Sequence, residues 1–317
     1  MTTTKLKPDW AGNDLLSRVV NRAIQTPALY ALMKRQARQV MIKTAEKNGV
    51  PWRQTCIDLD TPEMRQRLEA LTNPALVYPD YYQVPFHAYS EGNLCWQAAF
   101  EAAPATYAMA LRIWPQEAIS WQAAQARLRQ SFLAVLEAHG PAQVNDMLDL
   151  GCSVGISTLS LHRHYAQKHS PAARTVGLDL SPYMLAVAQA QDAQGEIAQW
   201  VHGAAEATGF ADGSFDVVTM QFVAHELPRT ATQAIFAEAL RVLRPGGALA
   251  IVDNNPQSPV IQALPPVLFT LMKSTEPWSD DYYTFDLEAA LWAAGFESSV
   301  TVPSDPRHRT LVARKGE

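Results

Sequence analysis

The chain has 317 residues, of which 48% are hydrophobic and 18% charged, and its net charge of −5 is ordinary for a globular protein of roughly two domains. It contains no run of about 18 apolar residues, so we expect no membrane span, and the opening MTTTKLKPDW lacks the apolar core of a secretory signal. Three scattered cysteines, Cys56, Cys95 and Cys152, predict neither a disulfide framework nor a zinc site and indicate a reducing compartment, the cytoplasm.

The charge is distributed unevenly along the chain. Residues 1–50 carry nine basic and three acidic residues, whereas the remaining 267 residues have a net charge of −11. An acidic body argues against a nucleic-acid substrate, which would need a basic face. Residues 28–47 have the pattern of a basic amphipathic helix. Its basic face is either solvated while the helix packs on its own domain, or it contacts an anionic membrane surface or an acidic partner.

The first part of the chain, residues 1–115, is predicted to form a helical cap domain. Within it, residues 73–91 hold three prolines, four tyrosines and a histidine without a helical period, which predicts an ordered aromatic loop. Residues 92–114 return to a helical pattern. The aromatic and imidazole side chains of this region either line a pocket or pack between domains; the candidates are Tyr82, His87, Tyr89 and Trp96.

The second part, residues 116–317, begins with an amphipathic helix over 119–139 and then alternates between strands and helices. This alternation predicts an α/β domain with a doubly wound parallel sheet. The predicted strands cover 147–150, 175–179, 198–202, 215–222, 248–253, 298–302 and 310–314. The predicted helices cover 156–167, 182–192, 231–243 and 287–294.

The segment Asp146–Ser157, DMLDLGCSVGIS, is the most informative stretch of the chain. A short apolar strand ends at an acid, and a turn punctuated by Gly151 and Gly155 leads into a helix. This arrangement brings a ligand against backbone amides and a helix N-terminus. The dinucleotide pattern would need a third glycine where Thr158 stands. With its acid before the first glycine, the segment instead resembles motif I of class I S-adenosylmethionine (SAM) methyltransferases.

Three further segments extend the resemblance over residues 117–315. They are VGLDLSPYML around Asp179, HGAAEATGFADGSFDVV over 202–218, and LRVLRPGGALAIV over 240–252. Alanine stands at 204, where the family has an aspartate that meets the adenine. The resemblance implies a Rossmann-like, seven-stranded methyltransferase sheet whose final strand is antiparallel. It also implies SAM as cofactor, S-adenosylhomocysteine as product, and a cofactor site made by Asp149, Gly151, Cys152, Ser153, Gly155, Asp179, Leu180, Ala205, Glu206 and Gln221.

The acceptor side is predicted at the carboxyl end of the fourth strand, in QFVAHELP over 221–228. His225 is the candidate general base, or else a residue that packs at a helix start. The insertion at 256–285 is rich in prolines and aromatic residues and is predicted to form a lid. Candidate acceptor contacts are Glu226, Asp253, Asn254, Trp278 and Tyr283. No metal site is indicated by the sequence.

Together these features predict SAM-dependent methyl transfer to a small apolar, aromatic or isoprenoid-like acceptor. The catalytic half resembles the type-11 group, which includes quinone methyltransferases, and the whole chain resembles an uncharacterised cyanobacterial and plastid group. One alternative is a catalytically inactive scaffold or sensor that binds SAM or its product. A second is an NAD(P)-dependent oxidoreductase, which the missing third glycine disfavours.

Overall fold

The computed structural model describes residues 15–87, 89–168 and 173–317, so residues 1–14 of the predicted cap lie outside the described part. Its centre is a seven-stranded sheet in the order β3-β2-β1-β4-β5-β7-β6. The strands are β1 (Asp146–Leu150), β2 (Arg174–Asp179), β3 (Gln199–His202), β4 (Phe215–Gln221), β5 (Leu243–Asn254), β6 (Ser298–Pro303) and β7 (His308–Arg314). The predicted α/β class and the seven strands are confirmed.

Strands β1 to β5 pair in parallel, and β7 pairs antiparallel with both β5 and β6. The antiparallel insertion implied by the family resemblance is therefore present. Strand β5 starts earlier than predicted, because Leu243 already pairs with Phe215. The register then shifts across Pro245-Gly246-Gly247, so that Val217 pairs with Ala248.

Both faces of the sheet are covered by helices, which explains why the central strands are nearly continuous apolar runs. Leu148 and Leu150 of β1 point into the core beneath α9 (Arg229–Val242) and α13 (Leu287–Ala294). Met147 points the other way, into the core shared with α6 (Trp121–His139) and α7 (Ile156–Ala166). This alternation follows from the two-residue period of a strand.

The remaining core helix, α8 (Pro182–Gln191), begins as the sequence predicts. Ser181 is its N-cap and accepts a hydrogen bond of 3.2 Å from the backbone N–H of Met184, and Pro182 occupies the first turn. Helix α8 connects the sheet to the N-terminal helices, since it packs against α4 and α5.

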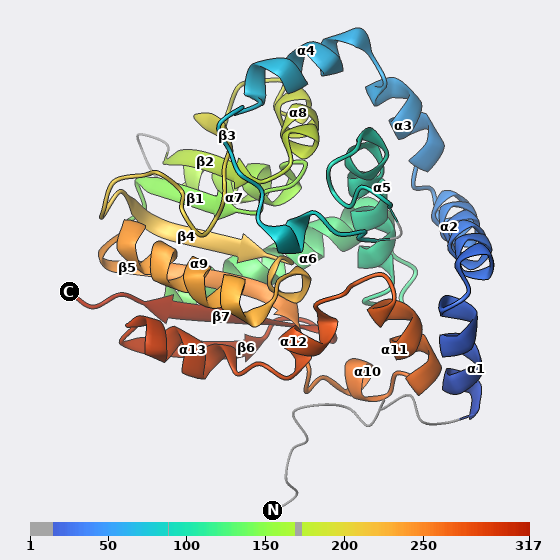
Figure 1. Ribbon diagram of the computed structural model, residues 1–317. Helices are drawn as coiled ribbons and strands as arrows, with labels where there is room; N and C mark the ends of the chain where they lie inside the picture. Colours follow the sequence, from blue (N-terminus) through green and yellow to red (C-terminus); the bar gives the residue numbers. More distant parts are fainter. Residues whose placement is uncertain (1–14, 88, 169–172) are drawn as a thin grey trace, which may run out of the picture.

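In the described part of the chain, five α-helices precede α6. They are α1 (Leu15–Ile24), α2 (Pro27–Lys47), α3 (Trp52–Leu59), α4 (Pro62–Leu71) and α5 (Trp96–Leu111). Figure 1 shows α1 to α4 following one another along one side of the molecule, from α11 at one end to α8 at the other. The proposed domain boundary near residue 115 falls between α5 and α6. Between α4 and α5 lies the aromatic segment 73–91, whose helical structure in the described part is one 3₁₀ turn, Asp80–Tyr82.

Helix α5 carries a proline in its interior, at Pro104. Proline lacks the N–H that would bond to the carbonyl four residues earlier. That carbonyl, Phe100 O, receives the thiol of Cys56 on α3 at a distance of 3.6 Å instead. The defect in α5 is therefore compensated by a contact within the cap.

The insertion at 256–285 folds into three short helices, α10 (Pro259–Gln262), α11 (Pro266–Lys273) and α12 (Ser279–Tyr283). Helix α11 contacts α1, so the insertion packs against the N-terminal helices. Within the described residues, no helix combines the length and apolar character needed to cross a membrane.

Candidate active site

One cavity of about 880 Å³ lies between the carboxyl ends of the strands and the cap. Such ends are where open α/β sheets bind ligands, and the volume is in the range of small-molecule sites. Its walls come from α2, the aromatic loop, α5, the glycine turn after β1, the ends of β2, β3 and β4, and α11. Residues from the two predicted domains and from the insertion therefore line the same cavity.

The glycine turn after β1 has the backbone that the sequence predicts. Gly151, Ser153 and Gly155 have φ angles of 68°, 49° and 80°, and Gly155 is the N-cap of α7. A Cβ at Gly151 would lie 2.6 Å from a methyl carbon of Val223, so this position admits only glycine without rearrangement. The serine at 153 occupies the same left-handed region, where non-glycine residues are uncommon.

Asp179, at the end of β2, is fixed by the glycine turn. The backbone N–H groups of Ser153 and Ser181 donate to its carboxylate at 2.8 Å and 2.7 Å. Burial raises its pKa to about 6, even though these two hydrogen bonds oppose the shift. The carboxylate lines the cavity. It is positioned to accept hydrogen bonds from a ligand with hydroxyl groups, as a ribose has.

Asp149 is placed differently from the expected cofactor contact. Its side chain is buried and is not part of the cavity wall. Hydroxyl groups of Ser157, Thr158 and Thr219 donate to it at 3.1, 2.7 and 2.6 Å. Asp149 therefore ties β1 to β4 and to the first turn of α7, and Thr158 is part of that network. A strand reverses side-chain direction at each residue, which is why the acid turns toward α7.

The side chains of Gln221 and Arg129 are buried in the cavity wall near the glycine turn. Arg129 comes from α6, and its Nη1 lies 3.5 Å from Gln221 Oε1. Burial lowers the pKa of Arg129 to about 10, so the group is still a cation at neutral pH. Among the described residues, Arg129 Nε and Gln221 Nε2 have no hydrogen-bond partner. Sequence reasoning missed Arg129, because a single arginine on an amphipathic helix carries no motif.

The sequence predicts that the adenine of the cofactor contacts Ala205 and Glu206. Ala205 lines the cavity, whereas Glu206 accepts a hydrogen bond from the hydroxyl of Tyr81 in the aromatic loop. Burial, and then this hydrogen bond, raise the pKa of Tyr81 far above its usual range. Glu206 thus connects the aromatic loop to the segment after β3 rather than facing the cavity.

His225 sits in a 3₁₀ turn, Ala224–Glu226, directly after β4. Its Nδ1 lies 2.8 Å from Asp253 Oδ1 at the end of β5, and Asp253 is fully buried. Burial favours a neutral imidazole, but the attraction of Asp253 outweighs it and raises the pKa of His225 to about 10. Asp253 therefore orients His225 from behind and is not part of the cavity wall. Whether His225 acts as a base stays a prediction.

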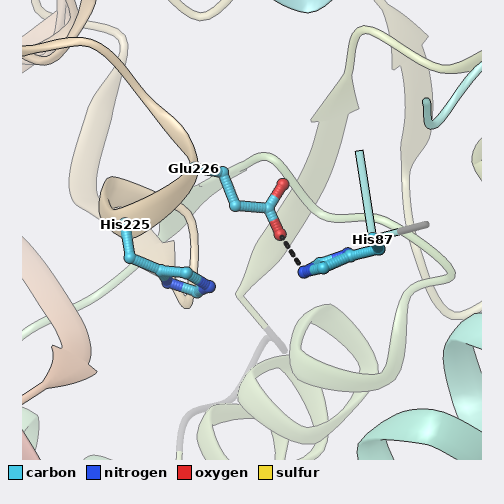
Figure 2. A group of neighbouring side chains, drawn as sticks. All are labelled: His87, His225 and Glu226. Carbon is cyan, nitrogen blue, oxygen red and sulfur yellow. Dashed lines mark ion pairs between the residues drawn. The ribbon is translucent and has the colours of Figure 1, made fainter. Parts of the chain in front are cut away.

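Glu226 and His87 face one another across the cavity (Figure 2). His87 Nε2 lies 3.9 Å from Glu226 Oε1 and 3.9 Å from Glu276 Oε1. Burial lowers the pKa of His87 to about 3, so its imidazole is neutral. Burial raises the pKa of Glu226 to about 8, and nearby Glu276 adds to the shift. The backbone N–H of His87 donates to Thr275 O at 2.9 Å, which links the aromatic loop to the insertion.

The structure brings most of the candidate residues to the cavity wall. Those that line it are Gly151, Cys152, Ser153, Asp179, Leu180, Ala205 and Gln221 for the cofactor, and Tyr82, His87, Tyr89, His225, Glu226 and Asn254 for the acceptor side. Those outside the wall are Asp149, Gly155, Glu206, Trp96, Asp253, Trp278 and Tyr283.

The three aromatic candidates outside the wall serve packing. Trp96 lies against Phe100 and Tyr183, with ring centroids 5.2 and 5.0 Å apart, and so joins α5 to α8. Trp278 donates its indole N–H to Tyr81 O at 3.4 Å. Tyr283 is buried in the core that the insertion shares with the sheet, α9 and α13. The periodicity of a sequence shows that an aromatic side chain is buried, but not which neighbours it meets.

The sheet order, the antiparallel β7, the glycine turn and Asp179 together have the arrangement of a class I, Rossmann-like methyltransferase domain. Residues 148–251, about a third of the chain, match the family described as "Methyltransferase domain".

Curated relatives agree with this assignment. An uncharacterised methyltransferase of Synechocystis is 36% identical over 151 residues, which are 47% of this chain and 66% of the relative. A demethylmenaquinone methyltransferase of Lactococcus lactis is 30% identical over 150 residues, which are 46% of this chain and 56% of the relative. The chain thus spans between about half and two thirds of the length of these two relatives.

A solved structure described as a candidate O-methyltransferase of Nostoc punctiforme has the same fold. The two structures align with a TM-score of 0.52 and 19% identity, over 81% of this chain and 71% of that one. At this identity the comparison supports the fold.

Proposed function

We propose that this chain is a SAM-dependent methyltransferase that acts on a small, mainly apolar acceptor. The observation that carries the proposal is the single cavity of about 880 Å³, which has the glycine turn and Asp179 at one end and the cap helices at the other. A methyltransferase needs such a shared space, because the methyl donor and the acceptor must meet in line.

The cofactor end fits SAM in three respects. Asp179 offers a fixed carboxylate to the ribose hydroxyls, and the glycine turn lets the ligand approach the backbone closely. Arg129 offers an unpaired, buried N–H and a positive charge, which suit the carboxylate of the methionine part. We assign the ribose to Asp179 and the methionine carboxylate to Arg129 on this chemistry. When bound, SAM supplies an electrophilic methyl group.

The acceptor end is mainly apolar. Alanine and methionine side chains of α5 and α2 form much of its wall; they are Met33, Ala37, Met41, Ala98, Ala102, Ala105 and Met109. Small side chains on α5 leave room where larger ones would fill the space. The Lactococcus relative is named a demethylmenaquinone methyltransferase, and an aromatic acceptor with an apolar tail would suit this wall.

The polar groups of the acceptor end gather at the turn after β4. Asp253 holds His225 in one orientation, with its Nε2 toward the cavity. Because its pKa of about 10 leaves His225 protonated at neutral pH, it would hold the acceptor atom by donating a hydrogen bond from Nε2, and it would act as the predicted base only from its neutral form. The side chains of the cap and the insertion would exclude water during the transfer.

The outer side of the cap suits contact with an anionic membrane surface, from which an apolar acceptor could be drawn. Helix α2 lines the cavity with Tyr30 and Met33, while Leu29, Leu32 and Val40 of the same helix are exposed. Exposed basic residues accompany them, namely Arg35, Lys43 and Lys47. Helix α1 adds Leu15, Leu16 and Val19. The location we propose is the cytoplasm, with reversible contact at such a surface.

The first test is thermal stability with SAM, S-adenosylhomocysteine and NAD(P) in separate samples. A ligand at about 100 times its Kd adds about 2.7 kcal/mol and raises the midpoint by several degrees. A rise with SAM and its product alone supports the cofactor site, and a rise with NAD(P) alone would favour the oxidoreductase. Labelled SAM with apolar metabolite extracts then separates an enzyme from an inactive scaffold, since only an enzyme passes the label to an acceptor.

A further inference from the structure

Three side chains with metal-binding atoms converge in the cavity, although they come from distant parts of the sequence. The nitrogen or oxygen donors of His87, His225 and Glu226 all lie within 4.8 Å of one another. Figure 2 shows His225 and Glu226 projecting from one turn and His87 meeting them from the aromatic loop. Ligands that share one metal ion at bond lengths of about 2.0–2.2 Å stand roughly 3–4 Å apart. Small side-chain movements would therefore bring the three side chains to the spacing that a shared metal ion needs.

Glu276, from the loop between α11 and α12, adds a carboxylate beside His87 but lies outside the group of three. Its Oε1 is as close to His87 Nε2 as that of Glu226, at 3.9 Å. Its other oxygen accepts a hydrogen bond of 3.2 Å from Ser279, which fixes the carboxylate. Glu276 also lines the cavity. The imidazole of His87 thus lies between two carboxylates.

The orientation of His225 is the one that metal-bound histidines have. Its Nδ1 is held by Asp253 at 2.8 Å, which leaves Nε2 for a ligand in the cavity. Asp253 itself is held by the backbone N–H groups of His225 and Asn254, at 3.1 and 2.7 Å. A carboxylate behind the histidine is the usual outer partner of a metal-bound imidazole, where it fixes the ring and raises its basicity.

The charge around the cluster favours a cation. Within residues 15–87, 89–168 and 173–317, neither Glu226 nor Glu276 forms an ion pair with a lysine or an arginine. His225 is protonated at neutral pH and partly balances the carboxylates of Glu226 and Glu276, and a bound dication would displace the proton on its Nε2 and take over that role. His87 also has a φ of 47°, a strained conformation for a residue with a side chain, and such strain is often found at functional sites.

We propose that His87, His225 and Glu226 bind one divalent transition-metal ion at the acceptor end of the cavity, with the carboxylate of Glu276 beside His87. Two imidazoles with one carboxylate suit zinc, iron(II) or manganese(II), whereas magnesium and calcium favour oxygen ligands alone. The ion faces the cavity and keeps a position open for a ligand oxygen. On the proposed function, on which this role rests, the ion would hold an acceptor oxygen and make its hydroxyl more acidic.

The test is metal binding to the whole chain, measured after treatment with a chelator and dialysis. Titration calorimetry with zinc chloride is expected to give one equivalent, and cobalt(II) is expected to give a visible absorption spectrum of a site with nitrogen and oxygen ligands. His87→Ala and Glu226→Gln are expected to weaken zinc binding at least tenfold. His139→Ala removes an exposed histidine at the end of α6 and should leave it unchanged.

The proposal is overturned if the wild-type protein binds no stoichiometric zinc, or if Glu226→Gln binds zinc as tightly as the wild type. Glu226→Gln keeps the size of the side chain, so it remains informative should His87→Ala fail to fold. SAM binding is measured on the same samples. Zinc binding without SAM binding contradicts the proposed function alone, and SAM binding without zinc binding contradicts the metal site alone.

Discussion

The backbone N–H of Ser153 donates a hydrogen bond of 2.8 Å to the carboxylate of Asp179, so the turn after β1 and the end of β2 are one unit. Ser181 donates to the other oxygen at 2.7 Å. The carboxylate is therefore set in place before any ligand arrives. Preorganisation of this kind reduces the entropy that binding costs.

Replacing Asp179 should weaken SAM binding, and it should also lower the stability of the glycine turn, because the backbone N–H groups of Ser153 and Ser181 lose their acceptor. Hydrogen bonds to a charged group contribute about 1.5–3 kcal/mol. We therefore expect Asp179→Ala to raise the Kd of SAM roughly 10- to 150-fold in titration calorimetry. Asp58→Ala, at an exposed position of α3, is the matched control and should bind SAM as the wild type does. Equal affinity in the two variants would contradict the ribose assignment.

The affinity for SAM should depend on pH through the same residue. Burial raises the pKa of Asp179 to about 6, so the carboxylate is charged above that pH and protonated below it. A protonated carboxyl group is a poorer acceptor for ribose hydroxyls. We expect the Kd to be nearly constant above about pH 7 and to rise up to tenfold per pH unit below about pH 6. Asp179→Asn should lose this dependence, and a wild-type protein with a flat profile would refute the explanation.

Arg129 should distinguish ligands that carry a carboxylate from ligands that do not. Arg129→Met is expected to weaken the binding of S-adenosylhomocysteine at least tenfold. The binding of methylthioadenosine, which lacks the amino-acid end, should stay unchanged. Arg127→Met, on the exposed side of the same helix, is the control. A parallel loss for both ligands would mean that Arg129 supports the structure rather than the carboxylate.

A larger side chain on α5 should block the acceptor and spare the cofactor. Ala102 lines the cavity, and Ala102→Phe would place a ring in its apolar end. With an acceptor found by the labelled-SAM screen, kcat/KM should fall at least tenfold while the Kd of SAM stays within about twofold. Ala134→Leu, on the exposed face of α6, controls for helix substitution. Unchanged turnover would place the acceptor elsewhere.

Contact with a membrane surface should depend on charge. Each basic residue near an anionic bilayer contributes about 1 kcal/mol, so Arg35→Glu and Lys43→Glu together should reduce binding to phosphatidylserine vesicles well over tenfold at low salt. Binding should also weaken as salt is added. Arg112→Glu, an exposed residue at the end of α5, is the control. If the wild-type protein does not bind these vesicles at low salt, the proposed membrane contact is wrong.

Much of the catalytic half could be predicted from local patterns. Apart from the start of β5, the strands lie within a few residues of their predicted ranges, and for the parallel central strands the reason is that a strand covered on both faces must be an apolar run of limited length. The start of α8 followed from Ser181 and Pro182, whose effects are confined to one turn. The start of β5 was missed, since the pairing of Leu243 with Phe215 depends on the register of another strand.

The sequence by itself therefore determined the sheet, the glycine turn and the acid after β2, since each depends on neighbours in the chain. Only the tertiary structure decided which side chains meet. It turned Asp149 toward Thr158, brought Arg129 from α6 beside Gln221, and set His87 opposite Glu226. These contacts arise because helices and loops far apart in sequence pack on the same edge of the sheet. A local sequence pattern does not predict which of these distant segments come into contact.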